Sequence, residues 1–185
     1  VAAEIIAIAG LRQVDVPVSL PPIDWEWAIA NQVGLYQELG ERWPACEEQM
    51  TKSMAFGVRM GIERYNLDIA ARVEEGRTAA NERMAAVFDQ TDFIICASNP
   101  DIAFPAHIES NTRVAGKKAP AGNNGALTIP ANISGNPAIS VPAGLVDGMP
   151  VGVQIIGVQH SDRAILDLAY LWEQHNPWPL TAPTN

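Results

Sequence analysis

The stretch NISGNPAISVPAGLVDGMPVGVQIIG, residues 132–157, sets five glycines and three prolines among apolar, often β-branched residues. Glycine and proline mark positions where the backbone must turn or where a side chain would not fit. The apolar runs 138–141 and 151–156 are typical of strands, and the residues between them predict a turn that leads one strand back along the other. Gly152, inside the second run, marks a point where we expect another backbone or side chain to come close.

The segments around this stretch predict a layered α/β fold, in which helices cover a mixed β-sheet. Residues 92–98 have the apolar composition of a buried strand, and residues 66–90 have the periodicity of a long helix with a solvated, charged face. Residues 161–175 predict a helix with Ser161 as its N-cap and an apolar stripe toward the core: Ile165, Leu168, Ala169 and Trp172. Few strands accompany these helices, so we expect part of the sheet to be missing.

The other segments predict shorter elements. A helix ends near Gly10, which is well placed to stop it. The remaining expectations are a strand over 13–20, a helix from the cap Asp24 to about Gly40, a helical stretch between Pro44 and Gly61, a polar loop over 99–122 and a short helix within 123–135.

Composition narrows the class of partner. The 185 residues carry 21 acidic and 12 basic side chains, a formal charge of −9, and no basic cluster exceeds the pair Lys117 and Lys118. Such a chain repels phosphate backbones, so nucleic acid is not expected as a partner. No segment approaches the roughly 20 apolar residues of a membrane span, and two isolated cysteines form neither a disulfide framework nor a zinc site. The expected location is the cytoplasm.

Catalytic and metal-binding residues are sparse. Ser134 and Ser140 are the candidate nucleophiles, but neither lies in a G-x-S-x-G motif and no base is evident beside them. A triad with one of the three histidines stays open, because such triads assemble in space. His107 and Glu109 offer two ligand types without a third at metal-site spacing, so we expect a solvated loop and no metal.

Residues 132–157, here called the signature stretch, and the helix after them resemble the C-terminal end of the amidase signature family. The family pattern there is an asparagine, a small-Gly-x-Pro turn, a strand ending in Val-Pro-x-Gly, then Gly-x-Pro-x-Gly-x-Gln and a helix with a late glutamate. The matching positions are Asn132, Gly135, Pro137, Val141, Pro142, Gly144, Gly148, Pro150, Gly152, Gln154, Gly157 and Glu173. The resemblance is firm over 89–185 and looser over 1–88, and it predicts that residues 1–185 form a single partial domain.

The resemblance implies hydrolysis of a carboxamide to a carboxylate and ammonia or an amine, without a cofactor. Family members use a serine nucleophile, a bridging serine in a cis peptide and a lysine base, and a glycine- and serine-rich loop supplies the oxyanion hole. This chain has no such loop, and none of its lysines, Lys52, Lys117 and Lys118, fits the base. We therefore expect an inactive C-terminal portion, starting mid-helix at Val1, whose partner is the N-terminal catalytic portion of the same protein.

The resemblance also predicts which residues line the substrate pocket. The family's short helix before the Asn-x-x-Gly turn, and the end of the strand preceding it, line the substrate pocket. By position these correspond to Gly125, Thr128 and Ile129, with Ser98 near the cleft. The alternative role of these residues is to pack the helix on the sheet. Amidotransferase subunits of the family carry an acidic residue where this chain has Gly125, which favours a simple amide hydrolase over a glutamine-using transferase.

Two other functions remain open at this point. One is a non-catalytic subunit or binding module that pairs with a separate catalytic chain, using an exposed sheet edge and apolar face. The other is an independent hydrolase that uses Ser134 or Ser140 with a histidine. An exposed apolar face could also be the interface between two copies of the chain, so a homo-oligomer stays open.

Overall fold

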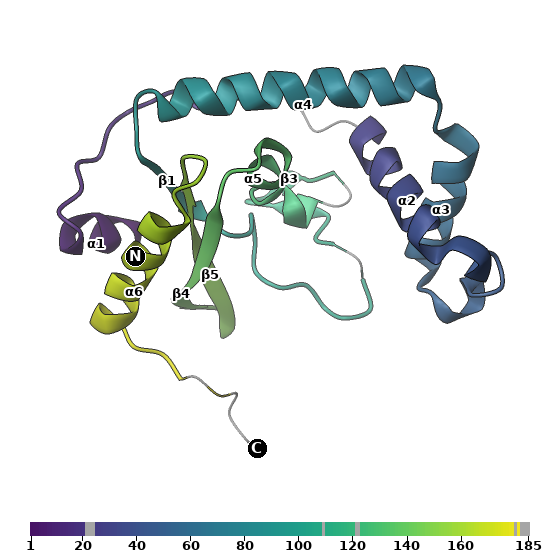
Figure 1. Ribbon diagram of the computed structural model, residues 1–185. Coiled ribbons are helices and arrows are strands. Elements are labelled where there is room, and N and C mark those ends of the chain that lie inside the picture. Colours follow the sequence, from purple (N-terminus) through teal and green to yellow (C-terminus); the bar gives the residue numbers. More distant parts are fainter. Residues whose placement is uncertain (21–24, 109, 121–122, 180, 182–185) are drawn as a thin grey trace. The chain divides into compact units, whose positions relative to one another are not determined.

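The computed structural model describes residues 1–20, 25–108, 110–120, 123–179 and 181 (Figure 1). Its α-helices are α1 (Ala2–Ile8), α2 (Trp25–Leu39), α3 (Lys52–Arg64), α4 (Leu67–Phe88), α5 (Ile129–Ser134) and α6 (Asp162–His175). Its strands are β1 (Phe93–Ala97), β2 (Arg113–Val114), β3 (Lys117–Lys118), β4 (Ala138–Val146) and β5 (Met149–Gly157). Three 3₁₀ turns, η1 (Gly40–Arg42), η2 (Glu47–Gln49) and η3 (Asn123–Gly125), complete the elements.

Two compact units divide the chain. One comprises residues 1–18 and 84–185, and the other comprises residues 19–83, so the boundary falls within α4. The first unit contains the three-stranded sheet and residues 132–157. The prediction of a single partial domain stays a prediction, because compact units can be parts of one domain or domains of their own.

The predicted layered α/β fold is confirmed. The sheet was predicted to be mixed, whereas its three described strands, in the order β1-β5-β4, pair only antiparallel. The strands predicted at 138–141 and 151–156 exist but extend further, over 138–146 and 149–157. A two-residue turn joins them, in which Asp147 and Gly148 have φ values of 51° and 76°. An Asp-Gly pair is well suited to such a turn, because both central residues need positive φ. The predicted connector is therefore mostly paired strand.

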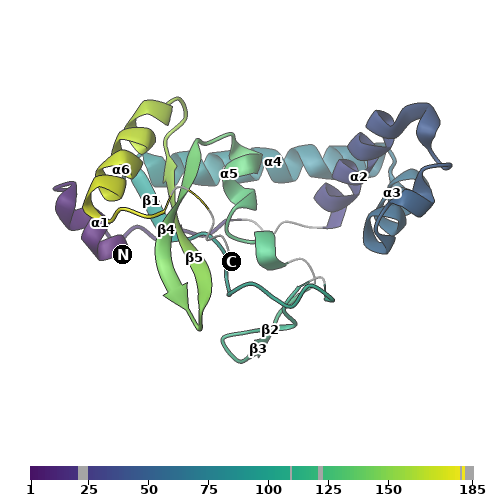
Figure 2. The same ribbon diagram turned by 90° about the horizontal axis from the view of Figure 1, so that it is seen from below.

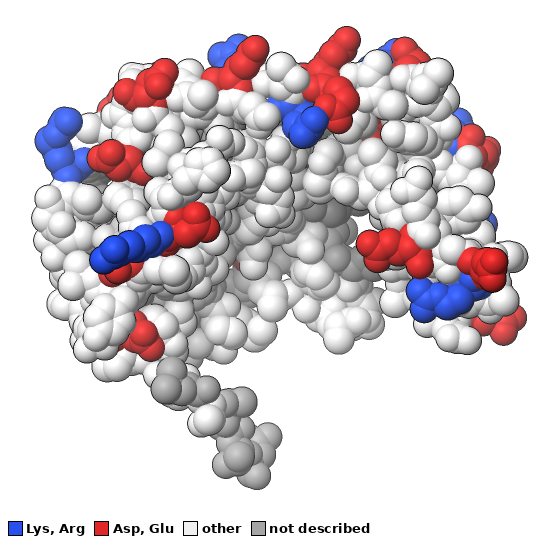
Figure 3. Space-filling model, viewed as in Figure 1, with Lys and Arg blue, Asp and Glu red and all other residues white. Residues whose placement is uncertain are grey.

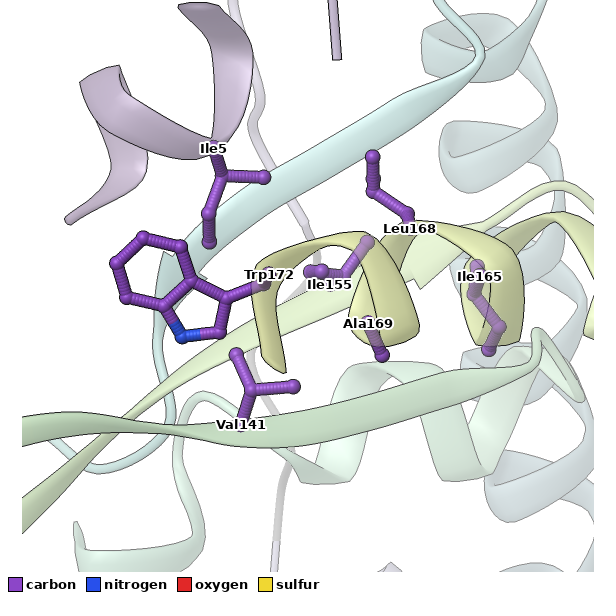
Figure 4. Packing of buried hydrophobic residues seen from close by; sticks show 7 residues of the cluster. All are labelled: Ile5, Val141, Ile155, Ile165, Leu168, Ala169 and Trp172. Atoms are coloured by element: carbon purple, nitrogen blue, oxygen red, sulfur yellow. The ribbon is translucent and has the colours of Figure 1, made fainter. Parts of the chain in front are cut away.

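One face of this sheet builds the core, which Figure 4 shows from close by. Alternate residues of each strand point to this face, where α6 and α1 pack on it. The buried members of the cluster are Ile5, Val141, Ile155, Ile165, Leu168, Ala169 and Trp172. The four residues predicted to face the core from α6 are thus all buried. The indole N–H of Trp172 also donates to the Pro142 carbonyl at 3.0 Å, which fixes α6 against β4.

The junction from β5 to α6 explains a signature glycine. A Cβ on Gly157 would lie 2.8 Å from Cγ2 of Ile165, on the first turn of α6. Ser161 is the N-cap, as predicted, but its hydroxyl donates to the Val158 carbonyl at 2.7 Å and does not cap the helix amides. Gly157 therefore lets α6 fold back tightly onto the sheet.

The second unit contains a close helix pair, α2 and α3. A Cβ on Gly61 would lie 3.1 Å from Cβ of Gln32 and 3.2 Å from the Val33 nitrogen, so the two backbones nearly touch there. Thr51 caps α3 by accepting the Met54 N–H at 3.3 Å. The helical stretch predicted between Pro44 and Gly61 is thus later and more broken than expected, with η2 before α3. The predicted cap Asp24 lies outside the described residues.

The long helix predicted over 66–90 is confirmed as α4, with Asn66 accepting the Ile69 N–H at 3.0 Å at its start. Acidic and basic side chains lie next to one another along it (Figure 3), including the ion pairs Arg72–Asp68 and Arg77–Glu74. All four of these side chains are more than half exposed, so they form the solvated face that the sequence indicated. Within the described residues, no helix is long and apolar enough to cross a membrane.

Two predictions about irregular segments were wrong. Residues 13–20 form no strand, because a strand needs a pairing neighbour and no described segment pairs with them. The loop predicted over 99–122 contains a small hairpin, β2–β3 (Figure 2), turned by Ala115 and Gly116 at φ values of 47° and 76°. The Ala-Gly turn carries a weak sequence signal, since alanine seldom adopts positive φ.

Candidate functional site

The second face of the sheet, opposite α6, carries a polar cluster at Gly152. Ser98 follows β1 and Ser140 lies on β4, so the central strand β5 separates them. Their hydroxyl oxygens nevertheless meet at 2.5 Å, directly over Gly152. A Cβ on Gly152 would lie 2.6 Å from the Ser140 hydroxyl oxygen and 2.8 Å from that of Ser98. The predicted close approach at Gly152 is therefore confirmed, and the missing side chain is what lets the two serines touch.

Gln154, two residues further along β5, holds the segment before α5 against the same face. Its side-chain amide donates to the Leu127 carbonyl at 2.9 Å and lies 3.5 Å from the Cys96 sulfur. Only 4% of Gln154 is exposed, so the amide has little access to water. Figures 1 and 2 show α5 and α6 on opposite sides of the sheet, and the bond to the Leu127 carbonyl ties Gln154 to the segment before α5. The signature glutamine is thus a structural tie.

The segment from η3 to α5 contains three of the four predicted substrate residues. The Thr128 hydroxyl and backbone N–H both point to the Gly125 carbonyl, at 3.2 and 3.1 Å. A Cβ on Gly125 would lie 3.0 Å from Cδ1 of Ile129, so that side chain fills the space beside the glycine. Gly125, Thr128 and Ile129 therefore form one local cluster.

The fourth predicted residue, Ser98, is linked to this cluster by hydrogen bonds of its neighbouring residues and not by its own. Ser98 is buried and its N–H donates to the Gly152 carbonyl at 2.9 Å. The next residue, Asn99, takes the amide orientation in which it donates to the carbonyls of Ser98 and Asn124, at 3.2 and 3.1 Å. No hydrogen bond joins Ser98 itself to Gly125 or Thr128 within the part of the chain described. The site roles of all four residues stay predictions.

A cavity of about 700 Å³, here called the strand-end cavity, opens beside the end of β1. Its polar lining comes from Asn99, Asp101, Asn111, Asn123 and Asn124, and its apolar lining includes Phe104, Val151 and Val153. The Asn111 amide donates to the Asp101 carboxylate at 2.9 Å and to the Ile102 carbonyl at 3.1 Å, which closes the loop at the cavity wall. The predicted residues Ser98, Gly125, Thr128 and Ile129 do not line this cavity; their direct neighbours Asn99 and Asn124 do.

The serine–histidine hypothesis finds no support in the contacts of either serine. The Ser134 hydroxyl donates to the Pro130 carbonyl at 2.9 Å inside its own helix, and Ser134 is only 4% exposed. Ser140 bonds to Ser98. Among the described residues no hydrogen bond joins a histidine to either serine, and His175 instead lies against the Trp172 ring, with centroids 6.0 Å apart.

Metal ligands and a lysine base are also lacking from the described site. No group of three or more His, Cys, Asp or Glu side chains is placed to hold a metal within the residues that the structure describes, and Glu109 lies outside them. Lys117 and Lys118 form the exposed strand β3, and the exposed Lys52 begins α3 in the other unit. Among the described residues, the hydroxyls of Ser98, Ser140 and Thr128 make hydrogen bonds within the protein, and the strand-end cavity is lined by amides, Asp101 and apolar side chains.

Comparison with known proteins identifies the family. A sequence profile described as Amidase matches residues 43–166, which is most of the chain. The chain belongs to the amidase family. The predicted resemblance to amidase signature enzymes is thus confirmed.

Sequence relatives are named as glutamyl-tRNA(Gln) amidotransferase subunits. Over 156 residues the chain is 29% identical to one such protein from Dehalococcoides mccartyi, covering 80% of this chain and 31% of that protein. It is 37% identical over 108 residues to the protein of the same name from Latilactobacillus sakei, covering 58% of this chain and 21% of that protein. The chain thus spans less than a third of the length of these relatives.

Solved amidases share the fold. A bacterial aryl acylamidase of the amidase signature family superposes with a TM-score of 0.75 at 22% identity, over 96% of this chain and 39% of that one. A 6-aminohexanoate cyclic dimer hydrolase superposes with a TM-score of 0.69 at 21% identity, over 96% and 40%. At these identities the likeness shows the fold alone.

The sequence missed the hydrogen-bonding partners at this site. The sequence marks Gln154 as a signature match, Ser140 as a candidate nucleophile and Asn99 as the start of a polar loop, without indicating the bonds that they make. The available signal was spacing: Ser140 and Gln154 fall opposite each other once 138–146 is folded back on 149–157. The contact of Ser140 with Ser98 had no local signal, because 42 residues separate them.

Proposed function

We propose that this chain is the C-terminal portion of an amidase-signature hydrolase that cleaves a carboxamide into a carboxylate and ammonia or an amine. The observation that carries the proposal is the family match over residues 43–166. The firm signature over 132–157 supports it, and the family chemistry needs neither metal nor cofactor. Its proposed location is the cytoplasm.

The chain's own contribution would be a wall of the substrate pocket. We assign Ser98, Gly125, Thr128 and Ile129 to this wall, next to the strand-end cavity. The hydroxyls of Ser98 and Thr128 already bond to Ser140 and to the Gly125 carbonyl, which suits a shaping role and not attack on the substrate. The ties from Gln154 and Asn99 would hold the wall in place.

The catalytic residues would come from the N-terminal portion of the same protein. The relatives are more than three times as long as the matched part of this chain, so most of their residues have no counterpart here. The Ser-Ser-Lys chemistry places a neutral lysine, a bridging serine and an oxyanion hole around the amide carbonyl. We infer that residues 1–185 without that portion are inactive, and that no nucleic acid or membrane takes part.

Gly125 favours hydrolysis over glutamine-dependent amide transfer. An acidic residue at this position, as the resemblance places it in transferase subunits, would need the Ile129 side chain to move away. Here the neighbouring isoleucine makes the wall apolar. The names of the sequence relatives point to the transferase, so the two reactions are the outcomes to separate by assay.

A second candidate is a non-catalytic subunit that binds a separate catalytic chain. The short coverage of the relatives favours it as much as it favours a covalent portion. Exposed apolar side chains on α6, Leu166 at 58% and Tyr170 at 62%, would suit a partner chain or a second copy.

The test starts from the product of the natural gene, purified and weighed intact, with amide hydrolysis measured on a generic aryl amide and on glutamine. A mass well above 19.9 kDa with aryl amide turnover supports the covalent amidase. A mass near 19.9 kDa with turnover only after a second chain is added supports the non-catalytic partner. Turnover by the 19.9 kDa species alone refutes both, and preference for glutamine refutes the assignment from Gly125.

A further inference from the structure

The polar wall of the strand-end cavity is rich in hydrogen-bond acceptors. The Asn111 amide uses its N–H groups inside the protein, on the Asp101 carboxylate at 2.9 Å and on the Ile102 carbonyl at 3.1 Å. The Asn99 amide uses its own on two backbone carbonyls, at 3.2 and 3.1 Å. What each amide has left is its oxygen, which accepts no hydrogen bond among the described residues.

A third amide oxygen at this wall has no partner. The Asn123 side chain is half-buried, and its Oδ1 atom is shielded from solvent without a donor in the described part of the chain. A buried acceptor without a donor is unfavourable, and most such groups in native proteins find a partner. A ligand N–H at this wall would supply the missing donor.

Asp101 gives the cavity a negative charge, and its bonded partners are neutral. These partners are the Ile102 N–H at 2.9 Å and the Asn111 amide. No Lys, Arg or His side chain lines the cavity among the described residues. The amino group of Val1, another lining residue, is paired with the Glu4 carboxylate at 3.3 Å. A cationic group on a ligand would therefore compensate the Asp101 charge.

The rest of the lining favours an organic cation over a metal ion. Phe104, Val151 and Val153 are half-buried and line the cavity. An aromatic ring attracts an ammonium group, and apolar side chains suit the carbon stem that carries it. Ca²⁺ takes about six to eight oxygen ligands. Asp101 supplies the single carboxylate that lines the cavity among the described residues, which is too few for a tight calcium site.

We propose that the strand-end cavity binds a protonated amine, and that the substrate of the amidase is a carboxamide that carries such an amino group. Asp101 pairs with the ammonium charge. The amide oxygens of Asn99, Asn111 and Asn123 are the acceptors available for its N–H groups, since an ammonium group has three donors and no acceptor. This inference rests on the proposed function: Asn99 and Asn124 line the cavity and adjoin residues assigned to the substrate wall.

Two isosteric amides test the substrate on the natural gene product. 5-Aminopentanamide has an ammonium group where hexanamide has a methyl group, and the two are otherwise alike. Each competes with a generic aryl amide, and its inhibition constant is measured. We expect about a tenfold lower inhibition constant for 5-aminopentanamide, because a charge-assisted hydrogen bond is stronger than a neutral contact. A difference of less than about threefold overturns the proposal.

Asp101→Asn removes the charge and keeps the size of the side chain. In this variant the two inhibition constants should differ by less than about threefold. Asp101→Glu keeps the charge and should retain most of the preference for the amine. The control is Asp162→Asn, which removes an exposed carboxylate at the start of α6 and should leave both constants within about twofold of wild type. A D101N protein with the wild-type preference overturns the proposal.

Binding of the amine is also measured without turnover, by saturation-transfer NMR with n-pentylamine and with 1-pentanol as the uncharged control. We expect saturation of the pentylamine signals and little of the pentanol signals in the wild-type protein. Equal saturation of the two overturns the proposal. Calcium chloride that abolishes the pentylamine signal at equal concentration assigns the oxygens to a metal ion and also overturns it. These wild-type comparisons decide alone if D101N does not fold.

The two readouts separate the amine site from the proposed function. Selective pentylamine binding in a protein that hydrolyses no amide leaves the cavity site in place and refutes the hydrolase. Hydrolysis of the aryl amide by a protein that does not bind pentylamine refutes the amine site and leaves the hydrolase in place.

Discussion

Gly152→Ala is the sharpest test of the polar cluster, because one methyl group must enter a space that two hydroxyls already fill. Its Cβ would lie 2.6 Å from the Ser140 oxygen and 2.8 Å from the Ser98 oxygen. Overpacking a tight site costs about 1–3 kcal/mol, and losing the serine–serine hydrogen bond costs about 1 kcal/mol more. We therefore expect the free energy of unfolding to fall by about 2–4 kcal/mol.

The assay is urea unfolding of the protein, with Gly76→Ala as the matched control. A Cβ at Gly76 meets nothing within 4 Å, and in the interior of α4 alanine is the better helix former, so this change should be neutral or stabilising by up to about 1 kcal/mol. Adding Ser140→Ala to Gly152→Ala removes the nearer hydroxyl and should recover part of the loss. A G152A protein within about 0.5 kcal/mol of wild type, the scatter of an ordinary surface change, refutes the packing argument.

Three further substitutions test the other contacts by the same urea measurement. Gln154→Leu removes the donor to the carbonyl of the half-buried Leu127 and should cost about 1–3 kcal/mol; no loss would show that the tie is dispensable. Gly61→Ala puts a Cβ 3.2 Å from the Val33 backbone nitrogen and should cost about 1–3 kcal/mol. An unchanged free energy of unfolding would show that α2 and α3 can move apart at no cost. Trp172→Phe keeps an aromatic ring but loses the bond to the Pro142 carbonyl, with an expected cost of about 1 kcal/mol or more; an unchanged stability would contradict the role given to that bond.

Local patterns determined the elements that rely on neighbours close in sequence. The long helix over 66–90 and the four core residues of α6 were predicted correctly, because helical spacing alone decides which residues share a face. The hairpin of 138–157 was predicted for a similar reason, since its turn and both strands lie within one continuous stretch. The family followed from the same stretch, where glycines and prolines stand at fixed spacing.

Only the tertiary structure decided which residues meet across distant segments. Ser98 and Ser140 touch because β5 runs between them and has no side chain at Gly152, a result of strand order that no local pattern contains. Residues 13–20 have the alternating composition of a strand, but the prediction of a strand there was wrong. A strand needs a partner strand to pair with as well as a suitable sequence pattern. Local sequence thus fixes which backbone shapes are favourable, whereas hydrogen bonds between strands depend on which segments the fold brings side by side.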